Sequence, residues 1–413
     1  MENVSVEGVR SAAIESGIRY ANRLDLVLFE LAEKTKTAGV FTLNAFCAAP
    51  VTVARRHIAA MSPRYLLINT GNANAGTGVQ GERDAIACCE AVARECGVNA
   101  EQVLPFSTGV IGELLPVDKI VSALPAAHKA LAVDQIAAAA RGIMTTDTRP
   151  KMVSRQVMVE GHQVTISGIA KGSGMIKPNM ATMLSYIFTD ARLTQSTLDR
   201  LLREQVARSF NRITVDGDTS TNDCCLLSAT GYSAAPVEAE SGQCHAVFEE
   251  ALADVFRELA VALIKDAEGA TKFVTVAVTG GRDSSECLQV GYAVAESPLV
   301  KTALFASDPN WGRILAAIGR AGLDNLDINA VEVWLGNTRI VENGCRDAHY
   351  TEAAGQAEMD KNEITISISL ARGDVSEKIF TADLSYDYVR INADYRSHCL
   401  LPLGLFKTRM VVC

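Results

Sequence analysis

The stretch KGSGMIKPNMATMLSYIFTDA, residues 171–191, joins a glycine- and proline-bearing loop to the apolar run MLSYIF. The dipeptide Ala181-Thr182 lies at the junction, and the whole stretch contains no histidine and no cysteine. Pro178 fixes its own φ and restricts the backbone of Lys177, so the loop should approach the junction stiffly. The apolar run has the length and composition of a buried strand. The stretch therefore predicts a buried strand with Thr182 at its head.

A threonine hydroxyl at this junction needs a base before it can act as a nucleophile. If the Thr182 hydroxyl attacks the carbonyl of Ala181, the peptide bond becomes an ester, and hydrolysis leaves Thr182 as a new N-terminus. The freed α-amine has a pKa of about 7.7–8.0 and can serve as a base near neutral pH. The simpler interpretation is that Thr182 only starts a buried strand. Local spacing alone favours that simpler interpretation.

Composition bounds the class of protein. The chain has 413 residues, of which 48% are hydrophobic and 21% charged, so a large core and more than one domain are expected. The formal net charge of -9 argues against a nucleic-acid partner, whose phosphates need clustered lysine and arginine. The N-terminus has no signal or transit pattern, and no apolar run approaches the roughly 18 residues that a membrane span needs. We expect a cytoplasmic protein that does not bind membranes.

The cysteines and acids give no metal pattern. Eleven cysteines are present, but no CxxC occurs, so free thiols are expected. The acidic segment DGDTSTND, residues 216–223, resembles the start of a calcium loop, but Leu227 stands where that loop needs a bidentate glutamate. We expect no metal, and we expect this segment to form hydrogen bonds around a turn near the site.

The order of elements predicts an α/β (α+β) fold with layered sheets covered by helices and a smaller strand-rich C-terminal domain. The predicted boundary lies near residues 281–286, which gives a catalytic domain over 1–283, a C-terminal domain over 284–397 and a tail over 398–413. The predicted elements are a strand over 65–69, a helix ending at Gly97, a helix over 128–144, a hairpin around Gly161, helices over 196–210 and 244–267, a strand over 272–281 and a strand-rich segment over 378–395.

Two further motifs could contribute to a site. In STGVIGE, Thr108 and Gly109 follow a strand, and their backbone N–H groups could stabilise an oxyanion, although a plain strand-to-turn junction is the simpler interpretation. In DAEGATK, Glu268 stands at the end of a long helix, where the helix dipole disfavours a carboxylate. It is either an ordinary solvated charge or a group held there for a cationic substrate.

Eight motifs in order resemble the ornithine acetyltransferase family, the bifunctional glutamate N-acetyltransferases of arginine biosynthesis. The resemblance runs from about Gly8 to Ser397, and each motif alone is modest, whereas the ordered set is specific. The motifs are FCAAPV, TGNANAGTG, STGVIGELLP, KGSGMIKPNMATML, DGDTSTND, DAEGATK, SDPNWGRI and YVRINADYR.

The resemblance implies a self-cleaving enzyme. It implies a cut between Ala181 and Thr182, with fragments 1–181 and 182–413 assembled as a heterotetramer. It also implies that Thr182 takes the acetyl group of N2-acetyl-ornithine and passes it to glutamate, without a cofactor, and that acetyl-CoA is a donor in some members. The implied site residues are Thr108 and Gly109 for the oxyanion, and Thr145, Lys171, Thr182, Glu268, Asn392 and Ser397 for the substrate.

Several points stay open on the residues alone. Lys171 could pair with a substrate carboxylate or lower the pKa of the Thr182 amine, and Glu268 could pair with the ornithine ammonium or with a neighbouring base. Contacts from both domains would place the site at their interface. Family members commonly end near the position of Ser397, whereas this chain continues for 413 − 397 = 16 residues. The roles of Ser397 and, to a lesser degree, Asn392 therefore depend on the route of this tail.

Three alternatives remain at this level. The first is a self-processing aminopeptidase or amidase of the same general fold, with water as the acceptor. The second is an acetyltransferase-like enzyme that acts on another acyl-amino acid. The third is an inactive scaffold that stays uncut or is misassembled because of the tail.

Overall fold

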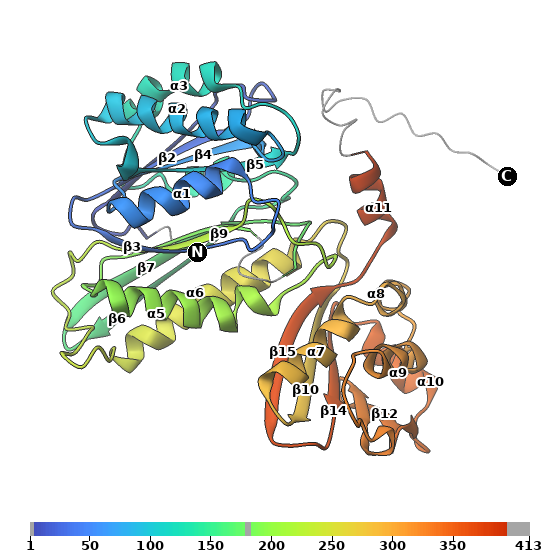
Figure 1. Cartoon of the computed structure of the whole chain (residues 1–413). Helices are drawn as coiled ribbons and strands as arrows, with labels where there is room; N and C mark the ends of the chain where they lie inside the picture. The colour runs from blue at the N-terminus through green and yellow to red at the C-terminus, as the bar shows by residue number, and fades with distance from the viewer. Residues whose placement is uncertain (1–3, 178–182, 395–413) are drawn as a thin grey trace.

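Two stacked sheets with helices on their outer faces make up the larger part of the molecule, and a third sheet forms a separate lobe (Figure 1). The computed structural model describes residues 4–177 and 183–394. Helices α2 (Gly78–Cys96) and α3 (Val117–Lys129) lie outside the first sheet, and α5 (Gln195–Arg208) and α6 (Ala246–Lys265) lie outside the second. The predicted layered α/β fold with a strand-rich C-terminal unit is confirmed.

The first sheet has the strand order β1-β2-β4-β5. β4 and β5 run parallel, and the other neighbours are antiparallel. The predicted strand from Tyr65 and the helix that ends before Gly97 are both present, and Gly97 closes α2 with a φ of 71°. The strands of this sheet, with the helices α1 and α4 that pack beside it, are β1 (Val9–Ile14), β2 (Leu26–Leu31), β4 (Tyr65–Asn72), β5 (Val103–Val110), α1 (Ala49–Ala60) and α4 (Ile136–Gly142).

The second sheet has the strand order β3-β9-β8-β7-β6 and contains the predicted buried strand at its centre. All six residues of β8 (Leu184–Thr189) are buried. At its start, Leu184 pairs with Lys171 of β7 on one side and with Cys224 of β9 on the other. The predicted hairpin around Gly161 is formed by β6 and β7. The other strands are β3 (Lys36–Phe41), β6 (Lys151–Val159), β7 (His162–Lys171) and β9 (Cys224–Ala229).

Aromatic side chains fill the space between the two sheets. Phe29 of the first sheet lies 5.0 Å, between ring centroids, from Phe188 of the second. Phe106 of the first sheet meets Tyr186 of the second edge to face at 5.4 Å. Such pairs add to the stabilisation from burial alone. The inner faces of β5 and β8 are thereby fixed against each other, which positions the ends of both strands.

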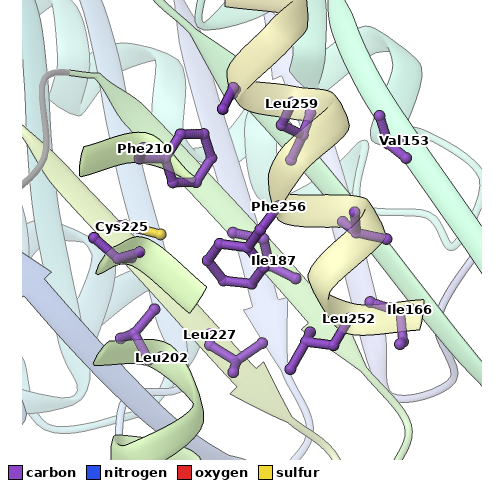
Figure 2. Close-up of a cluster of buried hydrophobic side chains, with 14 of the residues drawn as sticks. Val153, Ile166, Ile187, Leu202, Phe210, Cys225, Leu227, Leu252, Phe256 and Leu259 are labelled. Carbon is purple, nitrogen blue, oxygen red and sulfur yellow. The ribbon is translucent and has the colours of Figure 1, made fainter. Parts of the chain in front are cut away.

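A second core lies between the second sheet and the helices α5 and α6 (Figure 2). Phe256 of α6 lies at its centre, and its ring centroid is 5.6 Å from that of Phe210. Ile187 of β8 is fully buried in the same cluster. Residues of β8 thus face both cores alternately, as a strand covered on both faces requires.

The third sheet has the order β13-β12-β11-β14-β10-β15, and it includes a strand that the sequence placed in the first domain. β10 (Phe273–Gly281) pairs in parallel with β14 and antiparallel with β15, so the C-terminal sheet begins before residues 281–286. An apolar strand pattern does not reveal its partners, because pairing is set over long range. The remaining elements are α7 (Ser284–Ala295), α8 (Pro298–Phe305), α9 (Trp311–Gly319), β11 (Glu332–Leu335), β12 (Thr338–Glu342), β13 (Cys345–Arg346), α10 (Glu352–Met359), β14 (Glu363–Ser369) and β15 (Val375–Ala382).

Two predicted elements differ from the structure. The predicted helix over 128–144 is interrupted, because Ala132 leaves the helix to exchange two backbone hydrogen bonds, of 2.9 and 3.1 Å, with Ser11. The predicted strand-rich segment over 378–395 is a strand only as far as Ala382. It then forms the helix α11 (Tyr386–Ala393), whose first N–H groups donate to the Ser385 hydroxyl. A serine cap of this kind starts a helix even where the composition favours strands.

Replacing Phe256 with alanine should lower the free energy of unfolding by about 3–5 kcal/mol, because loss of a buried ring leaves a cavity. Phe256 is 0% exposed. Val247→Ala on the same helix is the matched control, since Val247 is 42% exposed, and its expected change is below about 0.5 kcal/mol. Urea unfolding followed by circular dichroism measures both variants. Equal losses in the two variants would contradict the central place of Phe256 in this core.

Candidate active site

Three predicted site residues meet where strands of both stacked sheets end. Lys171 is the last residue of β7, Thr108 lies near the end of β5, and Thr145 follows α4. The Lys171 Nζ donates to the Thr145 Oγ1 at 2.8 Å and to the Thr108 Oγ1 at 3.2 Å. One amino group thus joins the edges of the first and second sheets.

Gly109 has a backbone that other residues would not adopt. Its φ is 137°, and a Cβ atom placed on it would lie 2.3 Å from the carbonyl carbon of Gly71. The register between β4 and β5 shifts at Gly71 and Asn72, next to this contact. Unusual backbone conformations of this kind concentrate at functional sites. The predicted oxyanion position therefore lies in a segment whose course depends on glycine.

A buried acid that the sequence did not single out holds this cluster in place. One oxygen of Asp147, Oδ2, accepts from the backbone N–H of Thr145 at 3.0 Å, and the other, Oδ1, accepts from that of Gly172 at 2.8 Å. The Lys151 Nζ also contacts Asp147 Oδ1 and contacts Asp266 Oδ2, each at 2.5 Å. Asp147 thereby fixes the two chain segments that carry Thr145 and Lys171. The sequence TTDTRP does not indicate this role, because the two N–H groups that Asp147 binds belong to the backbone, and Gly172 lies far along the chain.

Burial and neighbouring charges set the protonation of this cluster. Burial raises the pKa of Asp147, but Lys171 and Lys151 outweigh it and lower that pKa to about 2. Burial lowers the pKa of Lys171, and the repulsion from Lys151 adds to this, while Asp147, Asp223 and Glu268 act in the opposite direction. Lysines whose pKa is lowered by burial and by neighbouring charges are found more often at functional sites than on the open surface.

Two other predicted residues meet each other from distant parts of the chain. Glu268, which is 9% exposed, follows α6, and its Oε2 accepts from the side-chain Nδ2 of Asn392 at 2.8 Å. Asn392 lies on α11, so the contact joins the stacked-sheet body to the end of the C-terminal lobe. The side chains of Glu268 and Asn392 therefore lie together. That they bind the substrate stays a prediction.

The segment after Lys171 links the two groups of residues. Glu268 donates its backbone N–H to the carbonyl of Ser173 at 2.8 Å. The Ser173 hydroxyl lies 2.7 Å from that of Thr146, next to Thr145. A Cβ atom on Gly174 would lie 2.5 Å from the Glu268 Oε2, so the carboxylate rests directly over this glycine. Residues 172–174 therefore set the separation between Lys171 and Glu268.

Asn222 and Asp223 are the other residues whose placement the sequence could not give. The Asn222 Nδ2 donates to the carbonyls of Ala73 at 2.6 Å and Ser107 at 2.9 Å, which ties the loop before β9 to the first sheet. Asp223 is 3% exposed, and its Oδ2 has no hydrogen-bond partner among the described residues. Burial raises the pKa of Asp223 well above its usual range. Burial thus disfavours the charged form of this carboxyl group, while the nearby Lys171 opposes that effect.

Thr182, Ala181 and Ser397 lie outside the described residues, as does the tail over 398–413. The described neighbour on the C-terminal side of Thr182 is Met183, whose carbonyl accepts from the backbone N–H of Cys224 at 2.9 Å. Because Leu184 pairs with Lys171, the chain next to Thr182 runs along the edge where the lysine cluster lies.

A pocket of about 310 Å³ lies elsewhere, between the start of α1 and the loop before α2, and none of the predicted site residues line it. The described residues contain no group of three or more metal-ligating side chains placed to hold an ion. No helix in the described ranges has both the length and the apolar composition that crossing a membrane requires. The nine cysteines in the described part of the chain are all free.

Comparison with known proteins identifies the relatives of the chain. The sequence profile of the ArgJ family matches residues 10–397. The chain belongs to the ArgJ family. The predicted resemblance to the ornithine acetyltransferases is thereby confirmed.

Close relatives match over almost their whole length. The arginine biosynthesis bifunctional protein ArgJ of Pseudomonas syringae pv. tomato is 57% identical over 95% of this chain and 97% of its own. The protein of that name from Methylococcus capsulatus is 55% identical over 95% and 96%. A crystal structure of the Bacillus halodurans protein of that name is 36% identical, with a TM-score of 0.49 over 52% of this chain and all of that one.

Replacing Asp147 with asparagine should lower the free energy of unfolding at pH 7 by about 3 kcal/mol, because it removes one of the two carboxylates that compensate the buried Lys151 and a nearby negative charge for Lys171. The pKa of Asp147 lies below its ordinary 3.8, so the carboxylate stabilises the fold above that pH. This stabilisation is lost as the pH falls from 3.8 towards 2. The difference between wild type and variant should therefore shrink over that interval.

Urea unfolding at pH 7, 4 and 2.5 measures this difference. Asp374→Asn is the control, because Asp374 is exposed and its replacement should change the free energy of unfolding little at any pH. A difference between wild type and Asp147→Asn that stays constant with pH would contradict the assigned charge of Asp147.

Proposed function

We propose that the protein transfers the acetyl group of N2-acetyl-ornithine to glutamate through an acetyl ester on Thr182, after cutting its own chain between Ala181 and Thr182. Membership of the ArgJ family supports the activity. The observation that carries the assignment of residues is the cluster of Lys171, Thr108 and Thr145 at the strand edge beside the start of β8.

The first step of the proposed reaction is the cut itself. The Thr182 hydroxyl attacks the Ala181 carbonyl carbon, its proton passes to the peptide nitrogen, and the C–N bond breaks to leave an ester and a free α-amine. Water then hydrolyses the ester, which leaves a carboxyl group on Ala181 and a hydroxyl and an α-amine on Thr182. The amine becomes basic only after the cut, so cleavage and activation are one event.

In acetyl transfer, the Thr182 hydroxyl attacks the acetyl carbonyl of the donor. The α-amine takes the hydroxyl proton and gives it to the departing amine of ornithine. Glutamate then attacks the acetyl ester with its own amine, which restores the threonine hydroxyl and gives N-acetyl-glutamate. Both steps pass through a tetrahedral oxyanion, and the proposed donors to it are the backbone N–H groups of Thr108 and Gly109. Loss of one such donor typically costs about 10²–10³ in rate.

The charged residues suit the ends of an amino-acid substrate. Ornithine carries a carboxylate and a side-chain ammonium, and Glu268 is the proposed partner of the ammonium, with Asn392 fixing the orientation of its carboxylate. Lys171 is the proposed partner of the substrate carboxylate, with Thr145 beside it. Glu268 follows α6 and Asn392 belongs to α11, so substrate binding would need two distant parts of the second fragment. Acetyl-CoA as a second donor, a heterotetramer of the two fragments, and a place in the cytoplasm complete the proposal.

Self-cleavage is tested by following the purified chain on a denaturing gel and by mass spectrometry. Wild type should give fragments of 181 and 413 − 181 = 232 residues. Thr182→Ala should stay intact, because it has no hydroxyl, whereas the control Thr182→Ser should still be cut. Cleavage of Thr182→Ala at the same bond would overturn the assignment of the nucleophile.

Acetyl transfer is tested with N2-acetyl-ornithine in the presence and absence of glutamate. Ornithine release by the mature protein should require glutamate, and acetyl-CoA is then tested as an alternative donor. Release without glutamate, at the same rate, would mean that water is the acceptor and that the protein is an amidase.

Gly174→Ala should raise the KM for N2-acetyl-ornithine by about tenfold, because the added methyl group displaces the Glu268 carboxylate. The displaced atoms belong to the end of a flexible side chain, so the thermal midpoint should hardly change. Gly319→Ala is the matched control, since a Cβ atom there meets nothing within 4 Å. An unchanged KM in Gly174→Ala would show that the position of the Glu268 carboxylate does not govern donor binding.

A further inference from the structure

One carboxylate, that of Asp216, accepts hydrogen bonds from two consecutive backbone N–H groups of the loop that leads to the proposed cleavage bond. Asp216 lies in the turn before β9, and its Oδ2 accepts from the backbone N–H of Met175 at 2.6 Å. Its Oδ1 accepts from the backbone N–H of Ile176 at 3.1 Å and from that of Asp218 at 3.2 Å. Residues 175 and 176 are thereby fixed from outside their own loop.

The conformation of this loop needs such support. Met175 has a φ of 53°, in the left-handed region that costs a non-glycine residue roughly 1–2 kcal/mol. Its side chain is 41% exposed and contributes little packing, whereas Ile176 is fully buried in the core beneath α6. The carbonyl of Ile176 accepts from the Val215 N–H at 2.8 Å, next to Asp216. The bonds to Asp216 thus secure a strained residue beside a buried one.

The same carboxylate also reaches the helix that carries Asn392. The Tyr388 hydroxyl, on α11, donates to the Asp216 Oδ2 at 3.1 Å. Tyr388 also packs against the core beneath α6, and its carbonyl accepts from the Asn392 Nδ2 at 3.0 Å. No residue of α11 is buried, so its position depends on surface contacts such as this bond, the bond from its cap Ser385 to the carbonyl of Gly269 at 2.6 Å and the ring contact of Tyr386 with Phe305. Burial raises the pKa of Asp216, and its four hydrogen bonds oppose the rise.

We propose that Asp216 is a positioning residue with two effects, to hold the loop before the cleavage bond and, through Tyr388, to hold α11 and its Asn392 against Glu268. The inference rests on the proposed function, because it concerns the same cleavage and the same substrate contact. It goes further by joining them: the group that orders the loop for the cut also orders the helix for the substrate. Neither the turn around Asp216 by itself nor membership of the ArgJ family implies that one residue connects the cleavage loop to α11.

Two substitutions separate the two effects. Asp216→Asn keeps the shape but turns an N–H₂ group towards one pair of donors, so either Met175 and Tyr388 or Ile176 and Asp218 lose their acceptor. Self-cleavage of this variant should slow by about tenfold or more, because hydrogen bonds to a charged group are lost from the reacting loop. Tyr388→Phe removes only the hydrogen bond that joins α11 to Asp216. It should be cut at the wild-type rate.

Mature Tyr388→Phe should show a KM for N2-acetyl-ornithine raised about five- to tenfold with kcat nearly unchanged, since only ground-state positioning is lost. Tyr386→Phe is the matched control on the same helix, because that side chain is 82% exposed and its ring still meets Phe305. Asp218→Asn is the control in the turn, since Asp218 contacts Asp216 through its backbone. Neither control should change the cleavage rate or the KM.

The outcomes are distinguishable from failure of the proposed function. If wild type is not cut, the proposed function fails before any variant is compared. If wild type is cut and Asp216→Asn is cut equally fast, the loop role of Asp216 is wrong while the proposed function stands. An unchanged KM in Tyr388→Phe overturns the link to α11. If Asp216→Asn does not fold, as judged by circular dichroism, Tyr388→Phe still decides the link to α11 through its KM and kcat, and Asp216→Glu, which keeps the charge but moves the carboxylate, decides the loop role through its cleavage rate.

Discussion

The position of Lys171 is the constraint on which the rest of the site depends. Its amino group contacts Thr108 of the first sheet and Thr145 of the loop after α4, while its backbone belongs to the second sheet. A partly buried amine is costly unless carboxylates lie near it. Asp147 supplies that charge and also binds the backbone on either side of the cluster. The two stacked sheets are thus locked together at the edge where the proposed chemistry takes place.

The stacking of aromatic side chains makes this lock possible. Phe106 of β5 and Tyr186 of β8 meet edge to face between the sheets, and β5 ends at the edge where β8 begins. A close-packed interior transmits such constraints, since small shifts of one strand would open voids around these rings. The glycines at positions 109 and 174 then allow backbone and carboxylate to approach closely where a side chain would interfere.

Long-range contacts bring the last helix to the site. α11 rises from the C-terminal lobe at the side of the stacked sheets (Figure 1), and hydrogen bonds join it to them through Asn392 at Glu268 and through Tyr388 at Asp216. Both contacts are hydrogen bonds to carboxylates, which are stronger than bonds between neutral groups. The geometry gives a physical reason why a residue near the end of the chain contributes to a site built mainly by the first 270 residues.

Local pattern was enough for several conclusions. The apolar run after Thr182 predicted β8, because burial on both faces produces a continuous hydrophobic strand, and the ordered motifs predicted the family. Local pattern failed where residues far apart in the sequence decide which element forms or which strands pair. The two hydrogen bonds between Ala132 and Ser11 divide the helix expected over 128–144, and pairing with β14 and β15 moves β10 into the third sheet. Likewise, only the tertiary structure gives Asp147, Asn222 and Asp216 their roles, since their partners are backbone groups or side chains far along the chain, which no local spacing encodes.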